Sequence, residues 1–295
     1  MKKILILGAG KRSFIGRNLD EELRARGCYV VFSPSREELN LLDIENFKKY
    51  VYEKNIDVIV NSAIHVPMFH GGEKEFFNDM QMFWNVQSVA NDVEKIIYFG
   101  SGAEYDKRFD IQDVREVEIG RTLPTSEYGL AKYTMNQLAK HSKNTYNLRL
   151  FGVFGKYELW QIKFISNLCC KAVFGLPLTV RRDCQFDFLY IKDLIDIVSW
   201  FIDNEPEYHD YNVCHGRGYG LLELASIVNG ASGKKLEIRL LDKTKNLDYT
   251  ASNERLNNQI KDLKITPMCE AIEELYCYYK KNINLIDFEL LRESK

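Results

Sequence analysis

The chain has 295 residues, of which 45% are hydrophobic, and its 40 Lys and Arg nearly balance its 42 Asp and Glu. This balance excludes the basic field with which proteins bind nucleic acid by neutralising phosphates. No stretch reaches the roughly 18 apolar residues of a membrane-spanning helix, and the apolar run before Gly8 is too short for a signal peptide. We therefore expect a cytoplasmic protein with one large α/β unit and a smaller appendage.

The predicted elements of the first 155 residues alternate between short apolar runs and amphipathic stretches. Runs that are apolar at every position suit strands buried on both faces, as in a parallel sheet. The predicted strands are Ile4–Gly8, Tyr29–Phe32, Val58–Val60, Ile96–Phe99 and Leu148–Phe154. The predicted helices between them cover residues 15–26, 43–54, 75–92 and 125–142. This alternation predicts an α/β fold with a Rossmann-type doubly wound parallel sheet.

The alternation of apolar runs and amphipathic stretches becomes less regular after Gly155. The predicted elements are helices at 161–174, 192–203, 220–229 and 268–281, and strands at Phe186–Ile191 and Tyr211–Val213. The last 14 residues show no clear period, so we expect an irregular tail.

Cysteines give no sign of a metal site. The chain has seven, an odd number, and no pair has a ligand spacing such as C-x-x-C. We expect free thiols in a reducing compartment. Cys169 and Cys170 lie on a predicted helix, and we interpret both as core residues.

A glycine-rich loop follows the first predicted strand. Gly8-Ala9-Gly10 ends the strand, and Ser13-Phe14-Ile15-Gly16 begins the helix. Glycines allow a sharp turn and a close approach to a pyrophosphate, and the helix N-terminus offers unpaired N–H groups to it. The spacing is longer than the usual G-x-G-x-x-G, but its position directly after a buried N-terminal strand still favours dinucleotide binding over a turn without a ligand.

The end of the second strand bears on which nicotinamide cofactor fits. NAD is typically bound there by a carboxylate on the adenine ribose, whereas this chain reads Phe32-Ser33-Pro34-Ser35-Arg36. An arginine with hydroxyls suits the 2′-phosphate of NADP, and Lys11 and Arg12 add positive charge. The alternatives are NAD, and an Arg36 that is merely solvated.

Tyr128 and Lys132 lie four residues apart, on one face of a predicted helix. An ammonium group beside a tyrosine lowers the pKa of the phenol toward a useful range for acid–base catalysis. Ser101 follows the buried run Ile96–Gly100, at the strand ends where doubly wound sheets bind ligands. Its hydroxyl can stabilise negative charge that develops on a substrate oxygen. The three residues together predict a catalytic set.

With these motifs the chain resembles the extended short-chain dehydrogenases/reductases of the nucleotide-sugar epimerase/dehydratase group. The resemblance covers nearly the whole chain and is greatest to GDP-fucose synthase-like reductases. Besides the glycine loop, Ser101, Tyr128 and Lys132, the segments that carry it are Arg36–Asp43, Asp57–Ala63, Asn85, Arg149–Gly155 and Phe186–Asp193.

The resemblance implies that residues 1–155, with 185–215 returning to them, form an NADP-binding domain. Residues 156–184 and 216–295 would then form a lobe that closes over a nucleoside-diphosphate sugar. Lys132 would also hold the nicotinamide ribose, and the helices at 75–92 and 125–142 would pair two copies into a homodimer. The implied cofactor contacts are Gly8, Gly10, Lys11, Arg12, Ser13, Phe14, Ile15, Gly16, Ser33, Ser35, Arg36, Asp43, Asn61, Ser62, Ala63, Phe99, Gly100, Phe151 and Val153. The implied substrate contacts are His65, Ala103, Glu104, Gly152, Lys163, Arg181 and Phe186.

Departures from the family pattern bear on the reaction. Relatives that epimerise carry a Cys at the position of Ala103 and a His near the position of Lys163. Relatives that are 4,6-dehydratases carry Asp-Glu at the positions of Gly102 and Ala103. A family Asn is replaced by Gly152. A family Arg is replaced by Phe186, for which Arg181 or Arg182 would substitute.

These departures favour simple NADPH-dependent reduction of a 4-keto sugar. The alternatives are a nucleotide-sugar 4-epimerase that retains NAD and a non-catalytic NADP-binding protein.

Overall fold

The computed structural model describes residues 1–64 and 75–293. In these residues six parallel strands form the first sheet, in the order β10-β6-β4-β3-β1-β2. The strands are β1 (Lys3–Leu7), β2 (Val30–Phe32), β3 (Val58–Asn61), β4 (Lys95–Ser101), β6 (Thr145–Leu150) and β10 (Asp210–Val213). The strand order reverses between β1 and β3, which is where a doubly wound sheet opens a crevice for ligands. The predicted fold class is confirmed.

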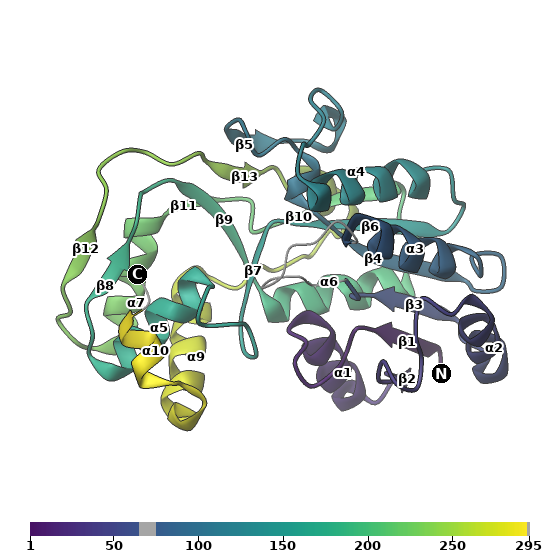
Figure 1. Ribbon diagram of the computed structural model, residues 1–295, viewed down its shortest axis with the longest axis horizontal. Coiled ribbons are helices and arrows are strands. Elements are labelled where there is room, and N and C mark those ends of the chain that lie inside the picture. Colours follow the sequence, from purple (N-terminus) through teal and green to yellow (C-terminus); the bar gives the residue numbers. More distant parts are fainter. Residues whose placement is uncertain (65–74, 294–295) are drawn as a thin grey trace.

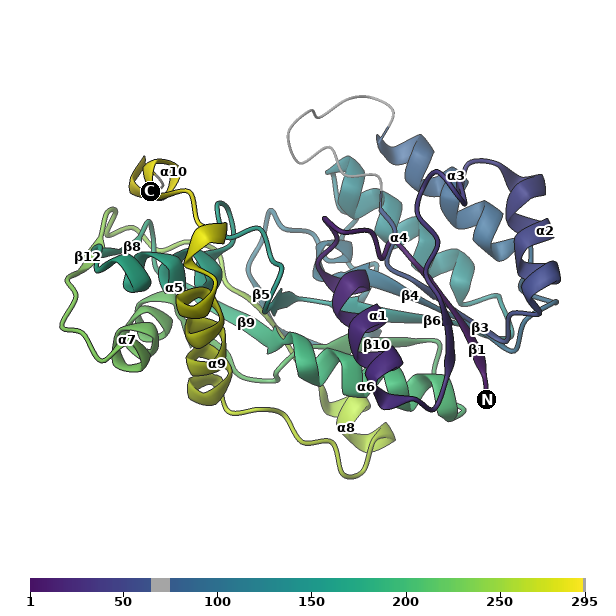
Figure 2. The same cartoon turned by 90° about the horizontal axis from the view of Figure 1, so that it is seen from below.

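Helices cover both faces of this sheet (Figure 2). The helices are α1 (Ile15–Arg26), α2 (Ile44–Lys54), α3 (Glu75–Gln87), α4 (Glu127–Ala139) and α6 (Ile191–Asp203). Successive strand residues point to opposite faces. Ile4 and Ile6 therefore join one core cluster with α1 and α6, whereas Leu5 and Leu7 join a second cluster with α2. Burial on both faces explains the continuous apolar runs within β1, β3 and β4.

A second lobe lies beside the first sheet (Figure 1). Its helices α5 (Phe164–Phe174), α7 (Leu221–Ser232) and α9 (Met268–Lys281) pack against one another. The other elements that follow β6 are β7 (Gly152–Phe154), β8 (Leu178–Val180), β9 (Gln185–Tyr190), β11 (Gly218–Gly220), β12 (Ile238–Leu240), β13 (Tyr249–Ala251), α8 (Glu254–Gln259) and α10 (Phe288–Glu293).

A second sheet joins the two parts of the chain. Its strand order is β11-β9-β13-β5, with β7 also paired to β9. The strand β5 (Ile111–Val114) comes shortly after β4, whereas β13 lies near the end of the chain. Pairing between β5 and β13 therefore carries a C-terminal segment to the carboxyl end of β4.

Most predicted helices and buried strands are found close to their predicted bounds. The helix predicted at 75–92 ends at Gln87. The run Leu148–Phe154 is two strands, because β6 belongs to the first sheet and β7 pairs with β9 in register Gly152 with Phe188. The irregular tail was a wrong prediction, since it contains α10, whose Leu291 is fully buried.

No helix among the described residues is long and apolar enough to cross a membrane. Cys169 and Cys170 are both fully buried, as predicted, because α5 packs against α7, α9 and α10.

Candidate active site

The glycine loop fits closely against the neighbouring strand end. Gly8 has a φ of +80°, and a Cβ added to it would lie 2.7 Å from the Ala63 nitrogen. A Cβ on Gly16 would lie 2.3 Å from the carbonyl oxygen of Gly8, whereas one on Gly10 would meet nothing within 4 Å. Packing therefore requires glycine at Gly8 and Gly16, whereas Gly10 borders open space. No side chain caps the N-terminus of α1 at Phe14, so its N–H groups can donate hydrogen bonds to an anion. These features fit a dinucleotide pyrophosphate.

The loop after β2 carries an exposed positive charge. Arg36 is exposed and, like Lys11 and Arg12, makes no ion pair with any described residue. Ser33 accepts a hydrogen bond from Arg24, and Ser35 exchanges hydrogen bonds with Glu38.

The remaining predicted cofactor residues lie on several elements. Asp43 caps α2 by accepting from the Asn46 nitrogen. Asn61 accepts from the Ala63 nitrogen at 3.0 Å, and the Ser62 hydroxyl donates to the Leu7 carbonyl at 2.6 Å. Of the other predicted residues, Phe99 and Gly100 are in β4, Phe151 lies between β6 and β7, and Val153 is in β7.

Lys132 is buried beside the carboxyl end of β4 and hydrogen-bonded to it. Its side chain is 5% exposed, and its ammonium group donates to the carbonyl oxygen of Phe99 at 2.8 Å. It lies 5.8 Å from the ring centroid of Tyr128. Burial lowers the pKa of Lys132, while the carboxylates of Asp79 and Glu104 oppose that shift. A buried cation beside a half-buried tyrosine suits stabilisation of a phenolate.

Ser101 and the start of α4 lie against each other. Ser101 is the last residue of β4, and its hydroxyl accepts from the Ala103 nitrogen at 3.1 Å. A Cβ on Gly129 would lie 2.6 Å from the carbonyl oxygen of Ala103, so the glycine after Tyr128 lets the helix approach this turn. Ser101, Tyr128 and Lys132 thus converge at the carboxyl end of β4.

Glu104 anchors the turn after Ser101. Its carboxylate accepts from the Ser101 nitrogen at 3.1 Å and from Arg149 Nε at 2.8 Å, and both charged side chains are fully buried. Arg149 also donates to Asp210 at 2.9 Å. Burial would raise the pKa of Asp210, but the arginine outweighs it and holds the pKa below its ordinary value. Glu104 was expected to contact substrate, but its burial and its pairing give it a structural position instead.

The other predicted substrate residues are spread around the second sheet. Phe186 stacks on Phe188 at 4.5 Å. Gly152 lies so close to β9 that an added Cβ would be 2.7 Å from the Asp187 oxygen. Ala103 is buried, and Lys163 and Arg181 are exposed.

Arg182, the alternative to Arg181, lies 4.0 Å from Asp242. His65 lies outside the described residues.

Two residues at this site were not predicted from the sequence. Tyr249, in β13, lies beside Ser101, and the Lys107 ammonium lies 4.5 Å from the Tyr249 ring centroid. Lys107 is exposed, but partial desolvation of its ammonium group lowers its pKa, and so does the neighbouring Lys163. No local motif marks Tyr249, because its place depends on strand pairing.

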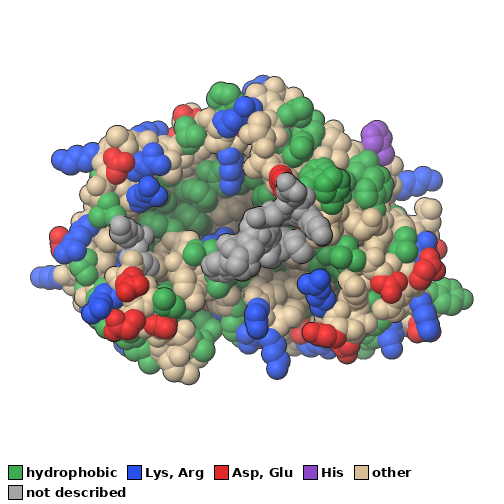
Figure 3. Space-filling model, in the orientation of Figure 1, with side chains coloured by type: hydrophobic (Ala, Val, Ile, Leu, Met, Phe, Trp, Pro, Cys, Tyr) green, Lys and Arg blue, Asp and Glu red, His purple; other side chains and the backbone are tan. Residues whose placement is uncertain are grey.

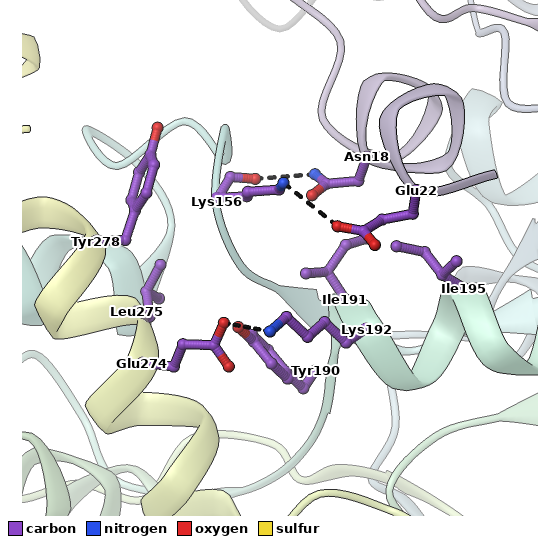
Figure 4. A pocket seen from close by; sticks show the side chains of 10 residues that line it. All are labelled: Asn18, Glu22, Lys156, Tyr190, Ile191, Lys192, Ile195, Glu274, Leu275 and Tyr278. Carbon is purple, nitrogen blue, oxygen red and sulfur yellow. Dashed lines mark hydrogen bonds and ion pairs between the residues drawn. The ribbon is translucent and has the colours of Figure 1, made fainter. Parts of the chain in front are cut away.

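The space-filling view shows a hollow between the two lobes with hydrophobic side chains inside it (Figure 3). A separate pocket of about 160 Å³ lies between α1, α6 and α9 (Figure 4). Its charged side chains are paired, Lys156 with Glu22 at 3.6 Å and Lys192 with Glu274. None of the predicted cofactor or substrate residues lines it.

A dinucleotide-type crevice with Ser, Tyr and Lys at one strand end defines an extended short-chain dehydrogenase/reductase. The sequence profile of the NAD dependent epimerase/dehydratase family matches residues 4–214, and the chain belongs to this family.

The chain is 24% identical over 258 residues to GDP-L-colitose synthase from Yersinia pseudotuberculosis, a match that covers 79% of this chain and 83% of that one. A GDP-L-fucose synthetase from Naegleria fowleri bound to NADP has a TM-score of 0.83 and 15% identity, over 96% of this chain and 94% of that one. The GDP-mannoheptose C4 reductase from Campylobacter jejuni with NADP bound has a TM-score of 0.79 and 18% identity, over 95% and 98%. At these identities the two structures show a shared fold.

The buried network predicts a large loss of stability on removal of Arg149. Arg149→Met should lower the free energy of unfolding by about 3–5 kcal/mol, because Glu104 would be left buried without its ion-pair partner and Asp210 would lose one of its own. Urea denaturation measures this change. The matched control is Lys140→Met, which removes a partly exposed cation 3.6 Å from Asp210 and should cost less than about 1 kcal/mol. Equal losses in the two variants would contradict the assignment.

Proposed function

We propose that this protein reduces a 4-keto group on a nucleoside-diphosphate sugar with NADPH. The observation that carries the proposal is the convergence of Ser101, Tyr128 and Lys132 where the neighbouring acids are already engaged. Glu104 is paired with Arg149 at 2.8 Å, and Asp106 accepts from Arg108 at 3.0 Å. The set can therefore transfer one proton. The acids of the turn are held by arginines, and Ala103 has no group that could transfer a second proton.

Tyr128, Lys132 and Ser101 each have a separate role in the proposed reaction. When bound, the nicotinamide supplies the hydride that reduces the carbonyl carbon. Tyr128 protonates the oxygen as negative charge develops on it, and Lys132 stabilises the resulting phenolate. Ser101 donates a hydrogen bond to the same oxygen. Lys132 would also hold the nicotinamide ribose.

The relatives support a nucleotide-linked substrate. GDP-L-colitose synthase and the GDP-mannoheptose C4 reductase are both named for GDP-linked sugars, and the second is named as a C4 reductase. GDP-linked keto sugars are therefore the first substrates to test, followed by CDP, UDP and dTDP sugars.

The Tyr128 assignment is tested by Tyr128→Phe. This variant should lose at least about 100-fold in kcat, because the phenyl ring has no proton to give, and it should still bind NADPH. Tyr133→Phe, on the same helix, is the control and should keep its activity. Full activity of Tyr128→Phe would refute the proposed role of Tyr128. Tightly bound NAD in the purified protein, with turnover that consumes no added NADPH, would instead identify a 4-epimerase.

NADP specificity is assigned to Arg36. Arg36→Ala should weaken NADPH binding by about 10- to 150-fold, because a charge-assisted contact to the 2′-phosphate contributes about 1.5–3 kcal/mol. NADH binding should hardly change, since NADH lacks that phosphate. Calorimetric titration of both cofactors measures the difference, with Arg239→Ala on β12 as the control. If Arg36→Ala changed the affinities for NADPH and NADH equally, Arg36 would not bind the 2′-phosphate, and the alternatives of NAD as cofactor or a merely solvated Arg36 would be favoured.

A homodimer through α3 and α4 is part of the proposal. These helices pack side by side and expose Phe77, Trp84 and Leu130, with Phe77 71% exposed and Trp84 49% exposed. Apolar residues exposed on neighbouring helices favour an interface. Light scattering should show a dimer that Trp84→Glu converts to a monomer, whereas Tyr52→Glu on α2 should leave it intact. A monomeric wild type would refute the dimer.

A further inference from the structure

Lys107 lies in the turn that follows Ser101, with its ammonium group over the ring of Tyr249. The distance from the nitrogen to the ring centroid is 4.5 Å. The same ring packs on the backbone of Gly102, since a Cβ added there would lie 2.7 Å from Tyr249 Cζ. The positive charge of Lys107 and the backbone directly after Ser101 therefore contact one aromatic ring.

The acids that precede Lys107 in this turn are bound by other cations. Glu104 pairs with Arg149 at 2.8 Å. Asp106 pairs with Arg108 at 2.6 Å. Lys107 itself makes no ion pair with any residue that the structure describes, and its side chain is exposed. Its charge is therefore available to a ligand.

Lys163 brings a second positive charge from the other lobe. It directly precedes α5, it is exposed, and within the described part of the chain it forms no ion pair. Its charge contributes to the lowered pKa of Lys107, so the two ammonium groups are close enough to repel each other. Lys163 also acts on Glu158, but burial raises the pKa of that carboxyl to about 7, and its oxygen accepts from Ser166 at 2.6 Å. Glu158 therefore neutralises Lys163 only in part.

Two neighbouring ammonium groups without a paired acid favour an anion between them. Their mutual repulsion costs free energy in the empty protein, and a bound anion would remove that cost. Lys107 follows β4 of the first sheet, whereas Lys163 precedes α5 of the second lobe. An anion held by both would therefore bridge the two parts of the molecule.

The place of the two lysines fits one part of the proposed substrate. In a nucleoside-diphosphate sugar the diphosphate is attached to C1, across the sugar ring from C4. Its site must lie near the reacting carbonyl but not on it. Lys107 meets this requirement, because it shares the Tyr249 ring with the backbone after Ser101 and does not contact the serine itself.

We propose that Lys107 and Lys163 together bind the diphosphate of the nucleotide sugar, one from each lobe. The identity of the ligand rests on the proposed function, which supplies the nucleoside-diphosphate sugar. Each ammonium group would donate charge-assisted hydrogen bonds to phosphate oxygens.

Calorimetric titration tests the site. GDP, CDP, UDP and dTDP are first titrated into the wild-type protein, and the nucleotide that binds most tightly is then titrated into Lys107→Gln and Lys163→Gln. Each variant should weaken its binding about tenfold, at the lower end of what a charge-assisted contact contributes, because both lysines are exposed.

The matched controls are Lys143→Gln in the first part of the chain and Lys235→Gln in the second lobe. Each removes an exposed lysine that has no ion pair among the described residues, and each should keep the wild-type affinity. Wild-type affinity in Lys107→Gln and Lys163→Gln would overturn the proposal, and so would a wild-type protein that binds none of the four nucleotides.

NADPH distinguishes this site from the cofactor crevice. Its affinity should be unchanged in Lys107→Gln and Lys163→Gln, because the cofactor pyrophosphate is assigned to the glycine loop. With a GDP-linked 4-keto hexose, KM should rise about tenfold while kcat stays near the wild-type value, since the diphosphate takes no part in the bond changes. A loss of NADPH affinity equal to the loss of nucleotide affinity would place the lysines at the cofactor and overturn the proposal.

The titrations need no turnover, so they can fail independently of the catalytic assignment. An inactive Tyr128→Phe, beside lysine variants with wild-type nucleotide affinity, would refute only the diphosphate site. A fully active Tyr128→Phe, beside lysine variants with weakened nucleotide binding, would refute the role of Tyr128 and leave the diphosphate site supported.

Discussion

A single buried guanidinium, that of Arg149, joins carboxylates from two distant parts of the chain. Charges in a protein interior cost several kcal/mol each unless they are paired and hydrogen-bonded. Arg149 in β6 meets Glu104 after β4 and Asp210 in β10, so the three strands must lie in their native register for every charge to be satisfied. The same Glu104 carboxylate holds the Ser101 nitrogen. The position of the proposed catalytic serine thus depends directly on the pairing of the core.

The electrostatics around the strand end suit a reaction that develops negative charge. The nearby carboxylates of Glu104 and Asp106 are held by arginines, and Lys132 is buried where its charge acts strongly. The exposed Lys107 adds a further cation, whose pKa is lowered by partial desolvation and by Lys163. An oxygen that gains charge here would meet a preorganised environment, which is how proteins stabilise such transition states.

Local signals in the sequence predicted the dinucleotide half of the fold well. The strands β1, β3 and β4 were predicted from their continuous apolar runs, which burial on both faces explains. The predictions failed where elements were too short for a period, as with the three-residue strands β8, β11, β12 and β13. They also failed at Phe151, where one apolar run passes from the first sheet to the second without any change in composition.

The sequence by itself determined the glycine loop, the Tyr128–Lys132 spacing and the place of Ser101 after a buried run, because each depends on residues close together in the chain. Only the tertiary structure decided that Glu104 faces Arg149 rather than the substrate, and that Tyr249 lies beside Ser101. Those contacts arise from strand pairing between segments far apart in the chain. Helical and strand periods report which face of an element is buried, and they carry no information about which distant element will cover it.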